Sequence, residues 1–172
     1  MIAIAMPLAS NIKARATELR NDTRSAAGAW LLKNIPAGSR LLMEAYTPQL
    51  PRGSYEFFGV TGSGFIARAG VSSWNPFQPI GQIGNLKELG DLRGQHIDFL
   101  VLSNWFERYS AEEALYPEAV RNYRAIIAGT TEIYRIDPAP GRMGGPTIRV
   151  LRVPPDSGAV GVSPANLHEL TS

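Results

Sequence analysis

The chain has 172 residues, 44% of them hydrophobic, and a formal net charge of +2. That length can bury one hydrophobic core but leaves little room for two, so we expect one globular domain with tails. The small and interspersed charge argues against a nucleic-acid-binding surface, and the absence of cysteine excludes disulfides, thiolate catalysis and cysteine-ligated metals. The two histidines, His96 and His168, lack the spacing of metal ligands, so we predict no metal site.

The two ends of the chain differ in composition from its middle. Residues 1–10, MIAIAMPLAS, form an apolar stub that is roughly half as long as a bilayer span requires. Two interpretations stay open for this stub: the first turn of a core element, or the end of a longer transmembrane helix. We expect residues 11–153 to form the α/β domain and residues 154–172, rich in Pro, Gly and Ser, to form a loosely ordered tail.

A helix followed closely by a strand is predicted near the start of the domain. Asp22 suits the N-cap of a helix over 22–35, in which apolar residues recur at intervals of three and four, and Pro36 ends that helix. The strand at 39–46 contains the continuous apolar run Leu-Leu-Met, which is typical of a strand covered on both faces.

Residues 48–84 are dense in Gly and Pro, and only 55–60 (YEFFGV) resembles a strand. The stretch TGSGFIA at 61–67 has the glycine spacing of a dinucleotide-binding loop. That motif needs a helix opening at its second glycine, and Pro76 and Pro79 cut any such helix short. We therefore interpret this region as an irregular insertion and predict no cofactor.

Three further strands and one long helix follow. Strands are predicted at 97–103, 131–137 and 147–153, and a helix at 117–128 with Pro117 in its first turn. In the last strand, arginines alternate with apolar residues, a pattern that suits the edge of a sheet.

These elements predict an α/β fold: a single layered domain with a mostly parallel central sheet of about four to five strands and helices packed on it. The strands at 39–46 and 97–103 are each entered from a preceding helix, so we expect them to be parallel neighbours.

Polar side chains follow both of these strands where they end. In an open α/β sheet, ligands bind beyond the carboxyl ends of the strands, so these residues either line a polar crevice or mark where the sheet meets water. The sequence shows no nucleophile elbow and no pair of carboxylates with a catalytic spacing, so we assign no catalytic residue. The candidate binding residues are Glu44, Tyr46, Thr47, Ser103 and Asn104, with Arg108 and Tyr109 as further lining.

Four segments, taken in order, resemble the C-terminal soluble domain of membrane glycosyltransferases that use a polyprenyl- or dolichyl-phosphate sugar, the protein-mannosyltransferase-like and aminoarabinose-transferase-like enzymes of the C-type glycosyltransferase fold. The resemblance spans roughly residues 10 to 153 and rests on small motifs in a fixed order. The segments are DTRSAAGAWLLKNIPAGSRLLMEAYTP, IDFLVLSNWFERY, YPEAVRNYRAI and GGPTIRVLRV. The residues that fit best are Asp22-Thr23-Arg24, Trp30, Ile35-Pro36, Gly38-Ser39, Glu44, Asp98-Phe99, Tyr123 and Gly145-Pro146.

The resemblance implies an extracytoplasmic (periplasmic or extracellular) domain that follows the last transmembrane helix of such an enzyme. In that family the catalytic acid lies in loops between earlier membrane helices, so no catalytic residue carries over to this chain. The domain would assist acceptor binding or architecture, with the membrane part of the same polypeptide and a glycosyl acceptor as its partners. Two alternatives stay open: a free-standing α/β module that binds a small anionic ligand through Arg108 and the strand ends, and a structural or oligomerisation domain.

Overall fold

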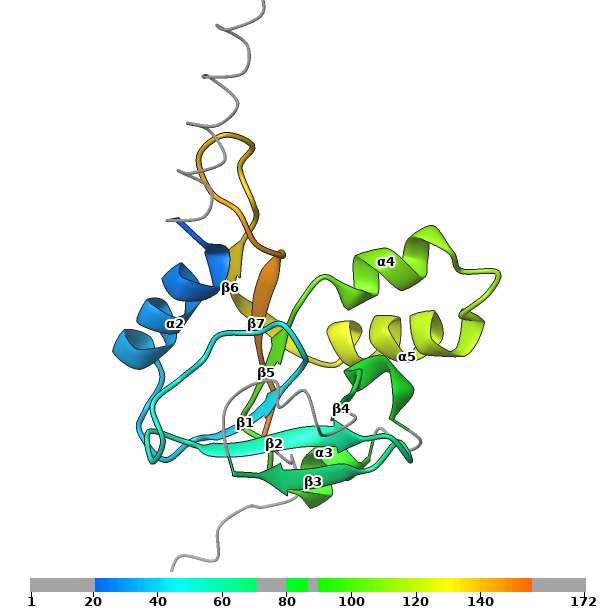
Figure 1. Cartoon of the computed structure of the whole chain (residues 1–172). Helices are drawn as coiled ribbons and strands as arrows, with labels where there is room; N and C mark the ends of the chain where they lie inside the picture. The colour runs from blue at the N-terminus through cyan, green and yellow to red at the C-terminus, as the bar shows by residue number, and fades with distance from the viewer. Residues whose placement is uncertain (1–20, 71–79, 87–89, 156–172) are drawn as a thin grey trace, which may run out of the picture.

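The computed structural model describes residues 21–70, 80–86 and 90–155. In this part of the chain, a twisted sheet has α2 on one face and α4 and α5 on the other (Figure 1). The apolar stub at 1–10 and nearly all of the predicted tail lie outside the described residues. The elements in chain order are α2 (Thr23–Asn34), β1 (Arg40–Met43), β2 (Glu56–Thr61), β3 (Ile66–Ala69), β4 (Ile80–Gly81), η1 (Ile83–Asn85), α3 (Asp91–Gly94), β5 (Phe99–Leu102), α4 (Trp105–Ala111), α5 (Pro117–Ala128), β6 (Thr131–Ile136) and β7 (Ile148–Arg152).

The strand order of the sheet is β3-β2-β1-β5-β7-β6, and β4 also pairs with β2. β1 runs parallel to β2 and β5, while all the other pairings are antiparallel. The prediction of a mostly parallel sheet of four to five strands is therefore wrong in both direction and number. The α/β class is confirmed, as is the parallel pairing of the two central strands, which aligns Leu41 with Phe99.

Two antiparallel hairpins account for the difference. The TGSGFIA stretch forms the turn between β2 and β3, where Gly64 has a φ of 83°, and continues into β3 rather than into a helix. This geometry excludes a dinucleotide loop at the stretch. The second hairpin joins β6 to β7 and occupies the other edge of the sheet. The chain reverses direction within each hairpin, so β3 at one edge of the sheet and β6 at the other run antiparallel to their neighbours.

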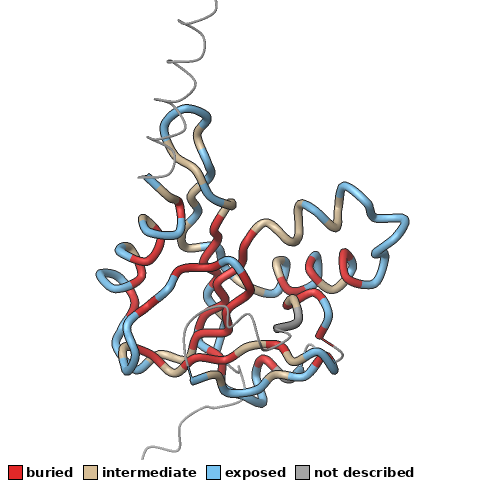
Figure 2. The backbone as a smooth tube through the Cα atoms, in the orientation of Figure 1, coloured by how far each residue is buried: buried red, intermediate tan, exposed pale blue. Residues whose placement is uncertain are grey.

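The sheet is buried on both faces. Leu41 and Met43 point into the core beneath α2, whereas Leu42 points into the core beneath α5 and η1. This alternation follows from the two-residue period of a strand. Burial is accordingly concentrated in the central strands (Figure 2).

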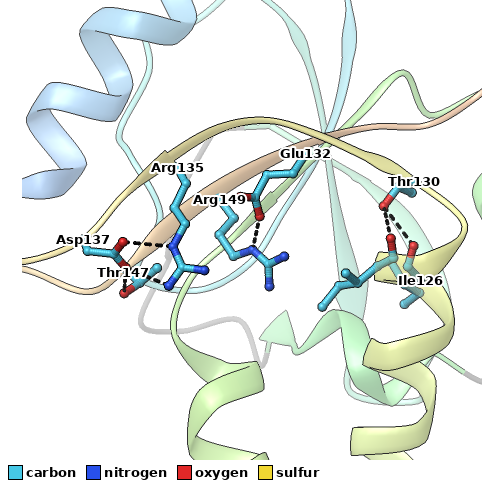
Figure 3. A network of polar contacts seen from close by, with 8 residues as sticks. Ile126, Thr130, Glu132, Arg135, Asp137, Thr147 and Arg149 are labelled. Carbon is cyan, nitrogen blue, oxygen red and sulfur yellow. Dashed lines mark hydrogen bonds and ion pairs between the residues drawn. The ribbon is translucent and has the colours of Figure 1, made fainter.

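The expected edge position of the last strand is wrong. β7 lies between β5 and β6, and Arg149 is only 9% exposed. Its guanidinium donates to the carboxylate of Glu132 on β6, and Arg135 and Asp137 form a second pair beside it (Figure 3). A buried charge is tolerated when it is paired in this way, so an arginine can occupy an interior strand.

The start of α2 is fastened to the loop between β6 and β7. Asp22 caps the helix by accepting from the backbone N–H of Arg24, as the sequence predicts. The Thr23 hydroxyl donates to the Pro146 carbonyl at 2.6 Å. Gly145 has a φ of 101°, and a Cβ atom there would lie 2.3 Å from the Thr23 hydroxyl oxygen. The tight contact therefore requires glycine at this position.

Candidate functional site

Glu44 follows β1 directly and is 1% exposed. Its Oε1 accepts from the Tyr123 hydroxyl of α5 and from the Ile83 N–H of η1 at 3.1 Å. Its Oε2 accepts from the Ser103 N–H at 2.9 Å, just past the end of β5. One carboxylate thus connects the ends of β1 and β5 with η1 and α5, which are distant from one another in the sequence.

The burial of this group governs its protonation. Burial raises the pKa of Glu44 to about 7, although the hydrogen bonds from Tyr123, Ser103 and Ile83 lower it in part. Burial and the nearby carboxylate also raise the pKa of Tyr123 well above its ordinary value, so the phenol keeps its proton and acts as a donor. The primary role of Glu44 in this geometry is to anchor the fold.

The next residues form a tight turn from Glu44 to Thr47. The Thr47 hydroxyl donates to the Glu44 carbonyl at 2.6 Å, and Thr47 itself is buried. Tyr46 has a φ of 65°, in the left-handed region that favours glycine, and its side chain is directed outward with 46% exposure. Since Glu44 and Thr47 are both held by hydrogen bonds, the turn keeps the Tyr46 ring at the surface in an unfavourable backbone conformation.

Helix α4, which the sequence analysis did not predict, places further aromatic side chains beside Tyr46. The ring of Trp105 lies 6.1 Å from that of Tyr46 and 5.7 Å from that of Tyr109, measured between centroids. The guanidinium carbon of Arg108 lies 4.6 Å from the centroid of the Trp105 ring. Arg108 forms no ion pair with a carboxylate of the described residues.

The seven predicted site residues divide into two sets. Ser103 is buried and donates to Glu44, whereas Asn104 is half-buried and precedes α4 without a side-chain capping bond. The inner set consists of Glu44, Thr47 and Ser103. The outer set consists of Tyr46, Asn104, Arg108 and Tyr109. The carboxyl ends of the strands do bring the two sets together, but only the outer set faces the surface.

A surface hollow of about 730 Å³ lies between α2 and the segment that follows β1. Small residues at the middle of the exposed face of α2 leave this space, and Gly28 lets the helix approach Pro48, where a Cβ would meet Pro48 Cβ at 3.4 Å. Tyr46 and Thr47 are predicted from the sequence, whereas the wall that α2 contributes is not. The hollow is lined by Asp22, Arg24, Ser25, Gly28, Ala29, Leu32, Tyr46, Thr47, Gln49 and Pro51.

A second hollow, of about 600 Å³, lies at the amino ends of β1 and β5. Arg93, His96 and Arg152 stand on its walls together with Asp98, whose carboxylate accepts from the Arg40 N–H at 2.8 Å. This hollow is not predictable from the sequence, because its basic residues come from separate elements. In the described part of the chain, no three histidine or carboxylate side chains gather closely enough to hold a metal ion.

Comparison with protein-family models, with curated proteins and with solved structures found no match to this chain.

Proposed function

We propose that this chain is the non-catalytic extracytoplasmic domain of a membrane glycosyltransferase that transfers a sugar from a polyprenyl- or dolichyl-phosphate donor, and that it contributes architecture and acceptor contact. The proposal rests on the resemblance described above. It assigns sugar transfer to the membrane part of the same polypeptide and places the domain on the periplasmic or extracellular side.

The observation that carries the proposal is that the residues underlying the resemblance meet one another in space. Glu44 accepts from Tyr123, a partner 79 residues away. The Thr23 hydroxyl donates to the carbonyl of Pro146, a residue 123 positions away. Motifs that are each weak as sequence signals are thus in contact in the folded domain, which supports the proposal that they belong together.

The positions of the hollow and of the outer aromatic residues agree with a role in acceptor contact. Both lie beyond the carboxyl end of a central parallel strand, where open α/β sheets bind ligands. None of the helices in the described residues is long and apolar enough to cross a bilayer. Membrane attachment is therefore part of the proposal and has to be tested by experiment.

The direct test is a transfer assay on membranes that contain the intact polypeptide. Residues 11–153 are deleted in frame, and transfer of labelled sugar from the polyprenyl-phosphate donor to the acceptor is compared with that of the intact protein. We expect transfer to fall while the membrane part is still produced and still binds donor. Unchanged transfer, or sugar transfer by the isolated 172-residue chain, would contradict the proposal.

A second candidate function is binding of a small anionic ligand by a free-standing module. The observation in its favour is the second hollow, which has Arg93, His96 and Arg152 on its walls. Basic side chains outnumber acidic ones there, as a site for an anion requires. Thermal-shift measurements with inorganic phosphate and with nucleotides test it. Stabilisation that is lost in Arg152→Gln would favour this candidate over the glycosyltransferase domain.

A further inference from the structure

We infer that the hollow beside α2 binds an uncharged saccharide ring, with Tyr46 as the stacking platform. This inference rests on the proposed function, which it deepens by naming the chemical class of the acceptor. It requires that the platform be held in place, that the walls offer hydrogen bonds suited to hydroxyl groups, and that the site carry little net charge.

The platform is held in place by buried contacts. Tyr46 lies in a left-handed backbone conformation between Glu44 and Thr47, both of which are at most 3% exposed. The Tyr46 ring lies 6.1 Å from the Trp105 ring, measured between centroids, and is still 46% exposed, so part of it is accessible to a ligand in the hollow. Strained residues of this kind cluster at ligand sites, and an aromatic ring presents a face on which the C–H groups of a sugar can pack.

The walls of the hollow carry side chains that can form hydrogen bonds with the hydroxyl groups of a sugar. Arg24 and Gln49 have planar side chains with several hydrogen-bonding atoms, and both are exposed, as is the hydroxyl-bearing Ser25. Leu32, which is 49% exposed, adds an apolar wall that suits the C–H edge of a ring. A mixture of an aromatic ring, an aliphatic side chain and planar polar groups matches a polyhydroxylated ring better than a lipid or a hydrophobic peptide.

The charges in the hollow cancel, which selects an uncharged ligand over an anion. Asp22 accepts from the Arg24 side chain at 2.9 Å and 2.6 Å, a bidentate pair. This pairing raises the pKa of Arg24 and lowers the pKa of Asp22, so both stay ionised and neutralise each other. Arg108, which has no carboxylate partner among the described residues, does not line the hollow. A phosphate or a sugar acid therefore finds no unpaired cation on these walls.

The experiment uses the whole 172-residue chain and saturation-transfer NMR with short uncharged oligosaccharides of glucose, mannose and galactose. Glucose 1-phosphate and vesicles containing polyprenyl phosphate serve as the anionic and lipid arms. Two variants address the site: Tyr46→Ala removes the platform, and Ala29→Phe fills the hollow from an exposed position of α2. Phe65→Ala is the control, since Phe65 is exposed to 45%, nearly as much as Tyr46, but lies in the β2–β3 turn.

We expect at least one uncharged oligosaccharide to bind, and both site variants to weaken that binding by about tenfold or more while the control variant leaves it unchanged. Absence of saccharide binding by the folded chain overturns the inference. So does binding that survives both site variants, or a preference for glucose 1-phosphate or the vesicles. Because the assay does not involve sugar transfer, its failure is distinct from failure of the deletion test: saccharide binding without any effect of the deletion would leave a sugar-binding module outside glycosyl transfer.

Discussion

The hydroxyl of Tyr123 on α5 donates a hydrogen bond to the carboxylate of Glu44 at the end of β1. The two residues are 79 positions apart, and the bond joins the central sheet to the helical layer that covers it. The same carboxylate anchors the turn that presents Tyr46. The stability of the core and the geometry of the candidate site therefore depend on one buried group.

Removing the donor should destabilise the protein. In Tyr123→Phe, Oε1 of Glu44 keeps only the backbone donor of Ile83, so a buried acceptor loses part of its compensation. We expect the free energy of unfolding to fall by about 1–3 kcal/mol in urea denaturation. Tyr116→Phe makes the same chemical change at an exposed tyrosine and should have an effect within about 0.5 kcal/mol. Equal effects in the two variants would contradict the anchoring role.

The stability of the protein should depend on pH through Glu44. Its pKa rises from 4.5 to about 7 on folding, so the folded state holds the proton more tightly than the unfolded state. The resulting stabilisation is complete below pH 4.5 and is lost as the pH rises through 7, a decrease of about 3 kcal/mol in the free energy of unfolding.

Glu44→Gln removes this titration and should flatten the pH dependence of stability between pH 4.5 and 7. The introduced amide N–H group will also face one of the buried donors, which lowers stability at every pH. Urea denaturation at a series of pH values measures both effects. A pH profile with the same slope in the wild type and in the variant would show that another group is responsible.

Two substitutions at Tyr46 should differ in stability in a way that reports its backbone conformation. Glycine adopts a φ of 65° without a steric penalty, whereas alanine does not. We expect Tyr46→Gly to be more stable than Tyr46→Ala by about 1 kcal/mol in thermal or urea unfolding. If alanine is the more stable of the two, the turn does not impose a left-handed conformation.

Gly145→Ala should loosen the attachment of α2 to the β6–β7 loop. The added Cβ would lie 2.3 Å from the Thr23 hydroxyl oxygen, at a residue whose φ of 101° is already unfavourable for alanine. We expect a loss of about 2 kcal/mol, measured by urea denaturation. Gly94→Ala is the comparison, because nothing lies within 4 Å of a Cβ there, and it should be close to neutral. A neutral Gly145→Ala would mean that the loop moves aside easily.

The sequence predicts the parallel centre of the fold because the signals there are local. Apolar runs of Leu41 to Met43 and Phe99 to Leu102, and the capping residue Asp22, identify their elements without reference to the rest of the chain. The hairpin of β2 and β3 is missed because its glycines read as an irregular loop. The edge assignment of β7 is wrong because the burial of Arg149 depends on Glu132 from another strand.

The sequence predicts that the candidate site lies at the ends of the central strands, but not which side chains are exposed there. The end of the strand at β1 points to Glu44 and Tyr46 as candidates. The burial of Glu44, however, depends on Tyr123, and the exposure of Tyr46 depends on a φ value that its residue type does not indicate. The wall of the hollow comes from α2, whose small residues Ser25, Gly28 and Ala29 do not indicate a ligand site in the sequence. Nothing in the local sequence links them to the end of β1.

The most direct test of the account is sugar transfer by the intact membrane glycosyltransferase of which we propose this chain to be a part, carrying Tyr46→Gly. This variant keeps the turn and removes only the platform, so the acceptor concentration needed for half-maximal transfer should rise about tenfold while the maximal rate changes little. Phe65→Ala should leave both unchanged. If Tyr46→Gly transfers sugar with the wild-type dependence on acceptor concentration, the hollow beside α2 does not bind the acceptor.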